Sequence, residues 1–305
     1  MMDKSKKLLG KFFRRLLPIK LYKLVANGVL VIPAYYKDII RDAETWFDLS
    51  QEETTDKKIM LARKYAHIID KGLHRPDAEA GHSDQYYRLL KDALCQLKDA
   101  GYADEPTLLW AQEKLKIYEA LQAEEMPPLK AEAPFVDVSF SQFQMLVQSR
   151  RSNRYFKADT VSDTTISKLK NLANWASSSC NKQPIEIYTT NDPDLAAECL
   201  KCCKGGTGFS EFIPTFWAFT ANVRGYVFPE EIYLPVVDTC LGVQNVMLGA
   251  TTLGLSGTLL SWAQKNAEEE LKLQKLLKIP PHHRIIICGV IGYADIHFMT
   301  PARKN

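Results

Sequence analysis

The sequence predicts an α+β domain preceded by an all-helical extension. In the first half, apolar residues recur at helical spacing across residues 87–97 and 108–121. The second half mixes helical segments with short apolar runs that are typical of strands, at residues 185–188, 214–221 and 284–293. A change of pattern between the halves indicates two structural regions.

A charged, proline-rich stretch at residues 124–134 marks the boundary between these regions. It cannot continue a helix, because proline lacks the backbone N–H and clashes with the preceding turn. We therefore expect a helical extension at residues 1–123, a linker at 124–134 and a second domain at 135–305. A length of 305 residues with 46% hydrophobic residues is ordinary for a globular protein of one or two domains.

The first 23 residues have the pattern of a basic amphipathic helix. Eight lysines and arginines surround an apolar stripe that includes Leu8, Leu9, Phe12 and Phe13. Such a helix either lies in an anionic membrane surface or packs its stripe on the rest of the protein, and the sequence leaves both open. The uncharged run at residues 24–36 is too short to span a bilayer, which takes about twenty apolar residues.

Residues 150–156 carry three arginines and a serine within five positions. Arg150, Arg151 and Arg154 offer planar forks of donors that pair with phosphate oxygens, and the Ser152 hydroxyl suits a remaining lone pair. A solvated basic helix end is the alternative interpretation, since charge clusters usually face solvent. A second polar segment, at residues 177–184, favours the interpretation that residues 150–156 bind a phosphate-bearing ligand.

That second segment, residues 177–184, reads Ser-Ser-Ser-Cys-Asn-Lys-Gln-Pro. It follows a predicted helix at residues 162–176 and precedes the predicted strand at 185–188. Small hydroxyls and amides at a helix exit can approach and hydrogen-bond a flat heterocycle. An ordinary polar loop is the alternative, because serine and asparagine favour turns for local reasons.

The two segments together resemble the FMN-dependent nitroreductase family. The matching patterns are Arg-Arg-Ser-x-Arg-x-Phe, followed after one helix by Ser-Ser-x-Asn-x-Gln-Pro. Residues 237–255 resemble the long central helix of that family, with its acidic start and terminal Leu-Gly-Leu. The resemblance covers about half the chain, from roughly residue 139, and implies a nitroreductase-like fold: a central mixed, largely antiparallel sheet flanked by helices.

The resemblance also implies the residues of a cofactor site. The FMN phosphate, ribityl chain and pyrimidine edge would be held by Arg150, Arg151, Ser152, Arg154 and Arg303. The same flavin would be approached from the partner subunit of a homodimer by Ser177, Ser178, Ser179 and Asn181, with Gln183 supporting their loop. The backbone at Leu259, Leu260 and Ser261 would run beside the ring and offer N–H groups toward N5 and O4.

We therefore expect an FMN-dependent oxidoreductase that takes a hydride from NADH or NADPH and reduces a small organic acceptor in a ping-pong cycle. The resemblance implies no catalytic side chain, because the flavin carries the chemistry. The alternative is an interaction or membrane-surface protein of a polysaccharide biosynthesis system. Residues 64–73 resemble an N-terminal segment of nitroreductase-like proteins from such loci. The physiological acceptor and the choice of NADH or NADPH stay open.

A long helix at residues 230–255 is apolar on nearly every face, which is more than one domain of this size buries. A second copy of the chain would cover the excess. We also expect the N-terminal helices to cover apolar surface or the mouth of the pocket.

Composition limits the partners, the cellular location and the metal sites that we expect. A net charge of +3 is too small to indicate nucleic acid as a partner, and seven cysteines without a recognisable signal peptide favour the cytoplasm, with a peripheral membrane location open. Cys199, Cys202 and Cys203 lack the second ligand pair of a zinc site and are expected to be half-buried apolar residues. The pair His282-His283 is explained by its place in a turn, so no metal site is expected.

Overall fold

The computed structural model describes residues 18–21, 52–75, 81–125, 136–260 and 267–303. The chain divides into two compact units, Met1–Leu49 and Ser50–Asn305. Only residues 18–21 of the first unit are described, so most of the predicted basic helix lies outside the described residues. The predicted linker also falls largely outside them.

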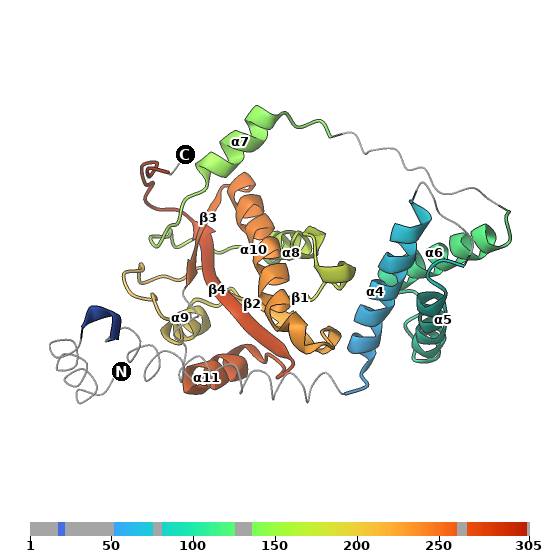
Figure 1. Cartoon of the computed structure of the whole chain (residues 1–305). Helices are drawn as coiled ribbons and strands as arrows, with labels where there is room; N and C mark the ends of the chain where they lie inside the picture. Colours follow the sequence, from blue (N-terminus) through green and yellow to red (C-terminus); the bar gives the residue numbers. More distant parts are fainter. Residues whose placement is uncertain (1–17, 22–51, 76–80, 126–135, 261–266, 304–305) are drawn as a thin grey trace. The chain divides into compact units, whose positions relative to one another are not determined.

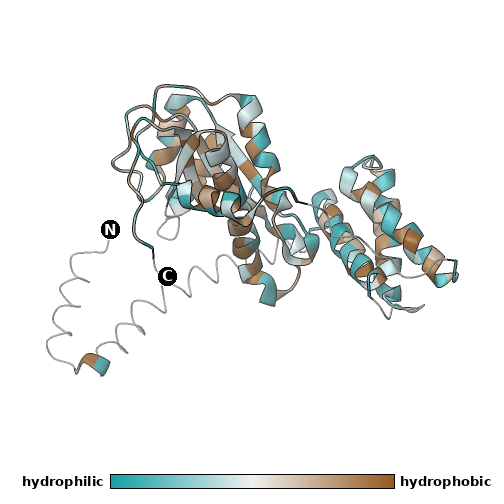
Figure 2. Cartoon of the chain, turned by 90° about the horizontal axis from the view of Figure 1, so that it is seen from above, coloured by the Kyte–Doolittle hydropathy of each residue, from teal (hydrophilic) through white to brown (hydrophobic). Residues whose placement is uncertain are grey.

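Three helices form the described part of the extension: α4 (Thr55–Leu73), α5 (Asp84–Asp99) and α6 (Pro106–Gln122). Each alternates apolar and polar residues around its axis, as Figure 2 shows. The apolar faces meet in one core that includes Ile69, Leu90 and Leu108, all at most 1% exposed. Helix α6 begins at Pro106, where the Glu105 carboxylate accepts a hydrogen bond from the Leu108 N–H at 2.9 Å.

The second half of the chain contains a sheet and further helices (Figure 1). Its helices are α7 (Phe140–Ser149), α8 (Asp163–Asn171), α9 (Pro193–Lys201), α10 (Leu234–Thr252) and α11 (Ala267–Leu277). Its strands are β1 (Ile185–Thr190), β2 (Phe216–Asn222), β3 (Leu255–Leu260) and β4 (His283–Tyr293). Short 3-10 turns are η2 (Ala173–Trp175), η3 (Ser179–Asn181), η4 (Val223–Gly225) and η5 (Pro229–Tyr233). The three strands expected at residues 185–188, 214–221 and 284–293 are thus present.

The described strands form one sheet in the order β1-β2-β4-β3, and each neighbouring pair is antiparallel. We expected a mixed, largely antiparallel sheet, and the described strands contain only antiparallel pairs. Strand β2 lies in the interior of the sheet and all seven of its residues are buried. The sheet is therefore covered on both faces.

Two hydrophobic clusters lie on the two faces. One joins α8 and α10 to Trp217, Phe219 and Ile291, and the other joins α9 and α11 to Phe216 and Val290. The second cluster contains Cys199, Cys202, Cys203 and Cys288. The first three of these cysteines are at most 8% exposed, so they are buried more fully than the half-buried positions predicted.

Helix α10 packs closely on the rest of the domain and still leaves apolar residues exposed. An added Cβ at Gly242 would lie 2.6 Å from the Ala173 carbonyl oxygen, so only glycine allows this approach. On its outer side, Tyr233, Val237 and Leu241 are 68%, 51% and 47% exposed. Among the described residues, the segment Glu230–Thr252 is the one long and apolar enough to cross a membrane, but it packs on the sheet as a core helix does.

Candidate functional site

The arginine-rich segment is fixed beside strand β3. The buried Asn153 donates from its backbone N–H to the Gly257 carbonyl at 3.4 Å, and the Thr258 hydroxyl donates to the Asn153 carbonyl at 2.5 Å. The Asn153 side chain donates to the Ile296 carbonyl at 2.7 Å and accepts from the Tyr155 N–H at 2.9 Å. Asn153 thereby fixes the backbone between Arg151 and Arg154. We gave it no role in the sequence analysis, because an asparagine among arginines carries no distinguishing signal.

Arg150, Arg151 and Arg303, which we call the arginine cluster, lie close enough to repel one another. Burial, followed by the charges of Arg303 and Arg151, lowers the pKa of Arg150. The Arg151 guanidinium donates to the Arg150 carbonyl at 2.8 Å and also to Thr300, which links helix α7 to the C-terminal segment. Among the described residues, no carboxylate forms an ion pair with the cluster. Uncompensated guanidinium groups of this kind suit an anionic ligand.

The other two predicted residues of this segment are exposed. The Arg154 guanidinium lies over the Phe209 ring, 5.8 Å from its centroid, and the Ser152 side chain faces solvent. Ser152 and Arg154 are two and four positions from Arg150 and so border the arginine cluster.

Residues 177–183, which we call the serine loop, are held by a buried carboxylate. Asp238 of α10 is 2% exposed and accepts hydrogen bonds from the Ser179 N–H at 3.0 Å, the Ser179 hydroxyl at 2.9 Å and the Tyr226 hydroxyl at 2.7 Å. Burial and the bond to Asp238 raise the pKa of Tyr226. These three bonds satisfy a carboxylate that would otherwise be costly to bury.

A second buried charge supports the same loop. Lys182 is 0% exposed, its Nζ lies 2.5 Å from Glu231 Oε1, and it stands over the Tyr226 ring at 4.4 Å. Burial lowers the pKa of Lys182, and Glu231 acts in the opposite direction. The sequence does not distinguish Lys182 or Glu231, because a lysine in a polar loop is usually a surface residue.

The serine loop also has a strained backbone. Cys180, Asn181 and Gln183 have φ angles of 52°, 56° and 50°, in the left-handed region that side-chain-bearing residues rarely adopt. Strain of this kind persists only where surrounding contacts determine the conformation, and it is common at ligand sites. Here Asp238 and the Lys182–Glu231 pair provide those contacts.

Hydrogen bonds within the loop leave few groups free. The Ser178 hydroxyl accepts from the Gln183 N–H at 3.0 Å, and the Gln183 amide donates to Asn181 Oδ1 at 3.1 Å. Ser177 is exposed, and its hydroxyl has no hydrogen-bond partner in the described part of the chain. The groups available to a ligand are therefore the Ser177 hydroxyl and the Asn181 amide nitrogen.

The arginine cluster and the serine loop lie toward opposite ends of α10. The serine loop is bonded to Asp238 in the first turns of that helix, whereas the arginine segment lies along β3, which begins three residues after α10 ends. A helix of 19 residues is about 28 Å long. One chain therefore does not gather all the predicted residues around one point.

We predicted that the backbone at Leu259, Leu260 and Ser261 runs beside the flavin ring. Leu259 and Leu260 are the last two residues of strand β3. Leu260 is 2% exposed and Leu259 is 37% exposed, while Ser261 lies outside the described residues.

Helix α4 of the extension contacts the region of the serine loop. Arg63 donates to the Lys182 carbonyl at 3.5 Å and pairs with Glu105 at 3.1 Å. At the start of α4, Asp56 accepts from the Asn222 amide at 2.7 Å and pairs with Arg224 at 3.2 Å. The extension and the sheet thus share polar contacts within the unit Ser50–Asn305.

Comparison with known proteins gives one family. The nitroreductase family model matches residues 147–207, which include both the arginine segment and the serine loop. An oxygen-insensitive NADPH nitroreductase from Salmonella typhimurium is 30% identical over 146 residues, 45% of this chain and 59% of the relative. The chain therefore spans less than two thirds of the length of that relative.

Two further proteins are similar over part of the chain. A protein of Archaeoglobus fulgidus, named for NADH dehydrogenase and NAD(P)H nitroreductase activity, is 27% identical over 152 residues, 48% of this chain and 83% of the relative. The solved structure of an FMN-dependent nitroreductase from Clostridium difficile has a TM-score of 0.45 and 20% identity, over 52% of this chain and 90% of that one.

Proposed function

We propose that this chain, whose residues 147–207 match the nitroreductase family model, is an FMN-dependent oxidoreductase of that family that takes a hydride from NADH or NADPH. The electrons pass to a small organic acceptor in a ping-pong cycle. The relatives from Salmonella typhimurium and Archaeoglobus fulgidus support the proposal, since their names describe NAD(P)H nitroreductases. Bound FMN would supply the hydride chemistry, and the protein would supply binding and electrostatics.

The arginine cluster is the observation that carries this proposal. Arg150 and Arg303 repel each other and have no carboxylate partner among the described residues, so a phosphate dianion would relieve the repulsion. The exposed Ser152 hydroxyl and the Arg154 guanidinium would extend the site toward the ribityl hydroxyls. The backbone at Leu259 and Leu260, at the end of β3, would run beside the ring.

We propose that the serine loop reaches the flavin from a second copy of the chain. Within one chain the loop is fixed toward the other end of α10 from the arginine cluster, so it does not complete that site itself. Tyr233 just before α10, Val237 and Leu241 on α10, and Trp175 of η2 are exposed, Trp175 by 85%, and offer an apolar surface for the second copy. In the dimer, Ser177 and the Asn181 amide would be the contacting groups.

The proposal is tested by the visible absorption spectrum of the purified protein before and after addition of NADPH under anaerobic conditions. We expect a flavin spectrum that bleaches on reduction, and FMN rather than FAD in the heat-released fraction. A colourless protein that takes up no FMN when FMN is supplied would overturn the proposal.

We propose a cytoplasmic location, which the seven free cysteines of the chain support. The alternative role as an interaction protein of a polysaccharide system, including membrane contact, depends on the basic N-terminal helix. That helix lies mostly outside the described residues, so the alternative stays a prediction.

A further inference from the structure

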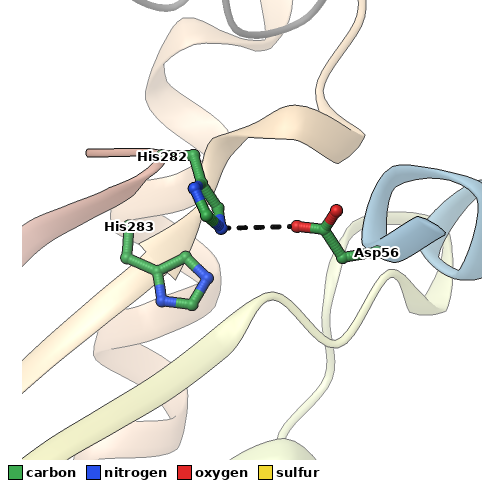
Figure 3. A group of neighbouring side chains, drawn as sticks. All are labelled: Asp56, His282 and His283. Carbon is green, nitrogen blue, oxygen red and sulfur yellow. Dashed lines mark ion pairs between the residues drawn. The ribbon is translucent and has the colours of Figure 1, made fainter. Parts of the chain in front are cut away.

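Three potential metal ligands converge where helix α4 meets the start of strand β4. Asp56 is the second residue of α4, and His282 and His283 lie at the turn that begins β4. One donor atom from each of the three residues lies within 4.8 Å of the other two. Figure 3 shows both imidazole rings turned toward the carboxylate, with the His282–Asp56 ion pair dashed. We call these three residues the His-Asp cluster.

The two imidazoles are held in place by other contacts. His282 Nε2 lies 3.4 Å from Asp56 Oδ2, and the two rings meet edge to face with centroids 4.4 Å apart. His283 Nδ1 lies 2.6 Å from the Tyr188 hydroxyl, which leaves Nε2 as its free nitrogen. A histidine that ligates a metal usually donates its other ring N–H to an oxygen, and Tyr188 is placed to accept it.

The charge around the cluster suits a cation. Asp56 pairs with Arg224, which also pairs with Glu52, so two carboxylates face one guanidinium. These two carboxylates and one guanidinium together carry one net negative charge. If Asp56 turned toward a metal, Arg224 would keep Glu52 as its partner.

We propose that Asp56, His282 and His283 form a binding site for a divalent transition metal, with Zn²⁺ as the fitting ion. Two imidazoles and one carboxylate are ligands that zinc accepts in protein sites, with water in the remaining position. Zinc–nitrogen bonds of about 2.0 Å at tetrahedral angles separate the donors by about 3.3 Å, so the widest donor pair closes by about 1.5 Å. The metal would fasten the helical extension to the sheet.

The site is independent of the flavin. Its three residues are not among those proposed to bind FMN. We expected no metal here from the sequence, because the position of His282 and His283 in a turn explains them without one. Asp56 lies more than 220 positions away in the chain, so sequence spacing did not associate it with the histidines.

The test uses the full-length protein, freed of metal with EDTA and then titrated with ZnCl₂ by calorimetry, with bound zinc measured by atomic emission. We expect one zinc per chain in the unaltered protein. His282→Gln should weaken zinc binding at least tenfold, because it removes a ligand, and Tyr188→Phe by about tenfold, because it removes the group that orients His283.

His297→Gln serves as the matched control, since His297 is exposed and lies outside the cluster. This variant should bind zinc as the unaltered protein does. Circular dichroism and FMN content show whether each variant is folded. The proposal is overturned if the unaltered protein binds no zinc, or if His282→Gln and His297→Gln bind it equally well, as they would if cysteines were the ligands.

Discussion

The arginine cluster and the serine loop use their polar groups in opposite ways. The positive charges of Arg150 and Arg303 repel each other and have no carboxylate partner among the described residues, so an anion would stabilise this region. In the loop, Ser179 bonds to Asp238 and Lys182 pairs with Glu231, so these two side chains are satisfied by the protein itself. We propose that the first region binds a ligand and that these contacts in the second region stabilise its conformation. Changes in the first should alter binding, and changes in the second should alter stability.

The largest effect on stability is expected for Asp238→Ala. This change leaves the Ser179 N–H, the Ser179 hydroxyl and the Tyr226 hydroxyl without their acceptor. Hydrogen bonds to a charged group contribute about 1.5–3 kcal/mol each, so unfolding in urea should show a loss of about 3–5 kcal/mol. Asp163→Ala is the control, since Asp163 is exposed and its carboxylate is bonded only to Asn191 among the described residues, and it should lose less than about 1 kcal/mol. Equal losses in the two variants would contradict the role given to Asp238.

The next effect concerns the buried Lys182–Glu231 pair. Glu231→Gln leaves the ammonium of a fully buried lysine without its counter-charge, which should cost about 3 kcal/mol of unfolding free energy. Adding Lys182→Met removes the unpaired charge. The double variant should therefore be more stable than Glu231→Gln alone in the same urea experiment. If the two changes instead destabilise additively, the pair is not coupled as the distance of 2.5 Å indicates.

Arg150→Ala should affect binding and leave stability nearly unchanged. Loss of one guanidinium from a phosphate site costs about 1.5–3 kcal/mol of affinity, so the Kd for FMN should rise roughly ten- to hundredfold. The unfolding free energy should change by less than about 0.5 kcal/mol, because the change also relieves repulsion from Arg151 and Arg303. Quenching of FMN fluorescence gives the Kd. Arg88→Ala, a surface arginine paired with Asp84, should keep the affinity, and an unaltered Kd in Arg150→Ala would refute the phosphate role.

The smallest effect is expected in the serine loop backbone. Cys180 has a φ of 52°, which costs a residue with a side chain about 1–2 kcal/mol. Glycine adopts this conformation freely but loses about 0.5–1 kcal/mol through its flexible unfolded state. Cys180→Gly should therefore stabilise the protein by about 0.5–1 kcal/mol in thermal unfolding. A loss of stability would mean that the cysteine side chain makes contacts that outweigh the strain.

The sequence predicted the sheet domain better than the site. Hydrophobic patterns identified helices α5 and α6 of the extension and the strands β1, β2 and β4, because burial on a fixed face leaves a local pattern. Charge density placed Arg150, Arg151 and Arg154 on one segment, and the family resemblance added Arg303, whose charge lowers the pKa of Arg150.

The contacts that hold the serine loop could not be predicted from the sequence. Ser179 and Asp238 are 59 positions apart, and Lys182 and Glu231 are 49 positions apart. No local pattern records that such residues meet, and a buried lysine resembles a surface lysine in sequence. The same holds for Asp56 and His282. Pairs that depend on tertiary packing become visible only in the folded chain.

The central claim is that one flavin site takes the arginine cluster from one copy of the chain and the serine loop from the other. Two variants separate these contributions. Arg150→Glu reverses a charge in the cluster, and Ser177→Trp places a large side chain at an exposed loop position where the ring would lie. Each variant alone should form a dimer that binds no FMN at micromolar concentration.

Co-expression of the two variants with different affinity tags yields a mixed dimer that can be purified through both tags. In that dimer one site carries both changes, and the other has an unaltered arginine cluster and an unaltered serine loop. We predict one FMN per mixed dimer, bound with the affinity of the unaltered protein. A mixed dimer that binds no FMN, or a Ser177→Trp dimer that binds FMN fully, would contradict a site shared between two copies.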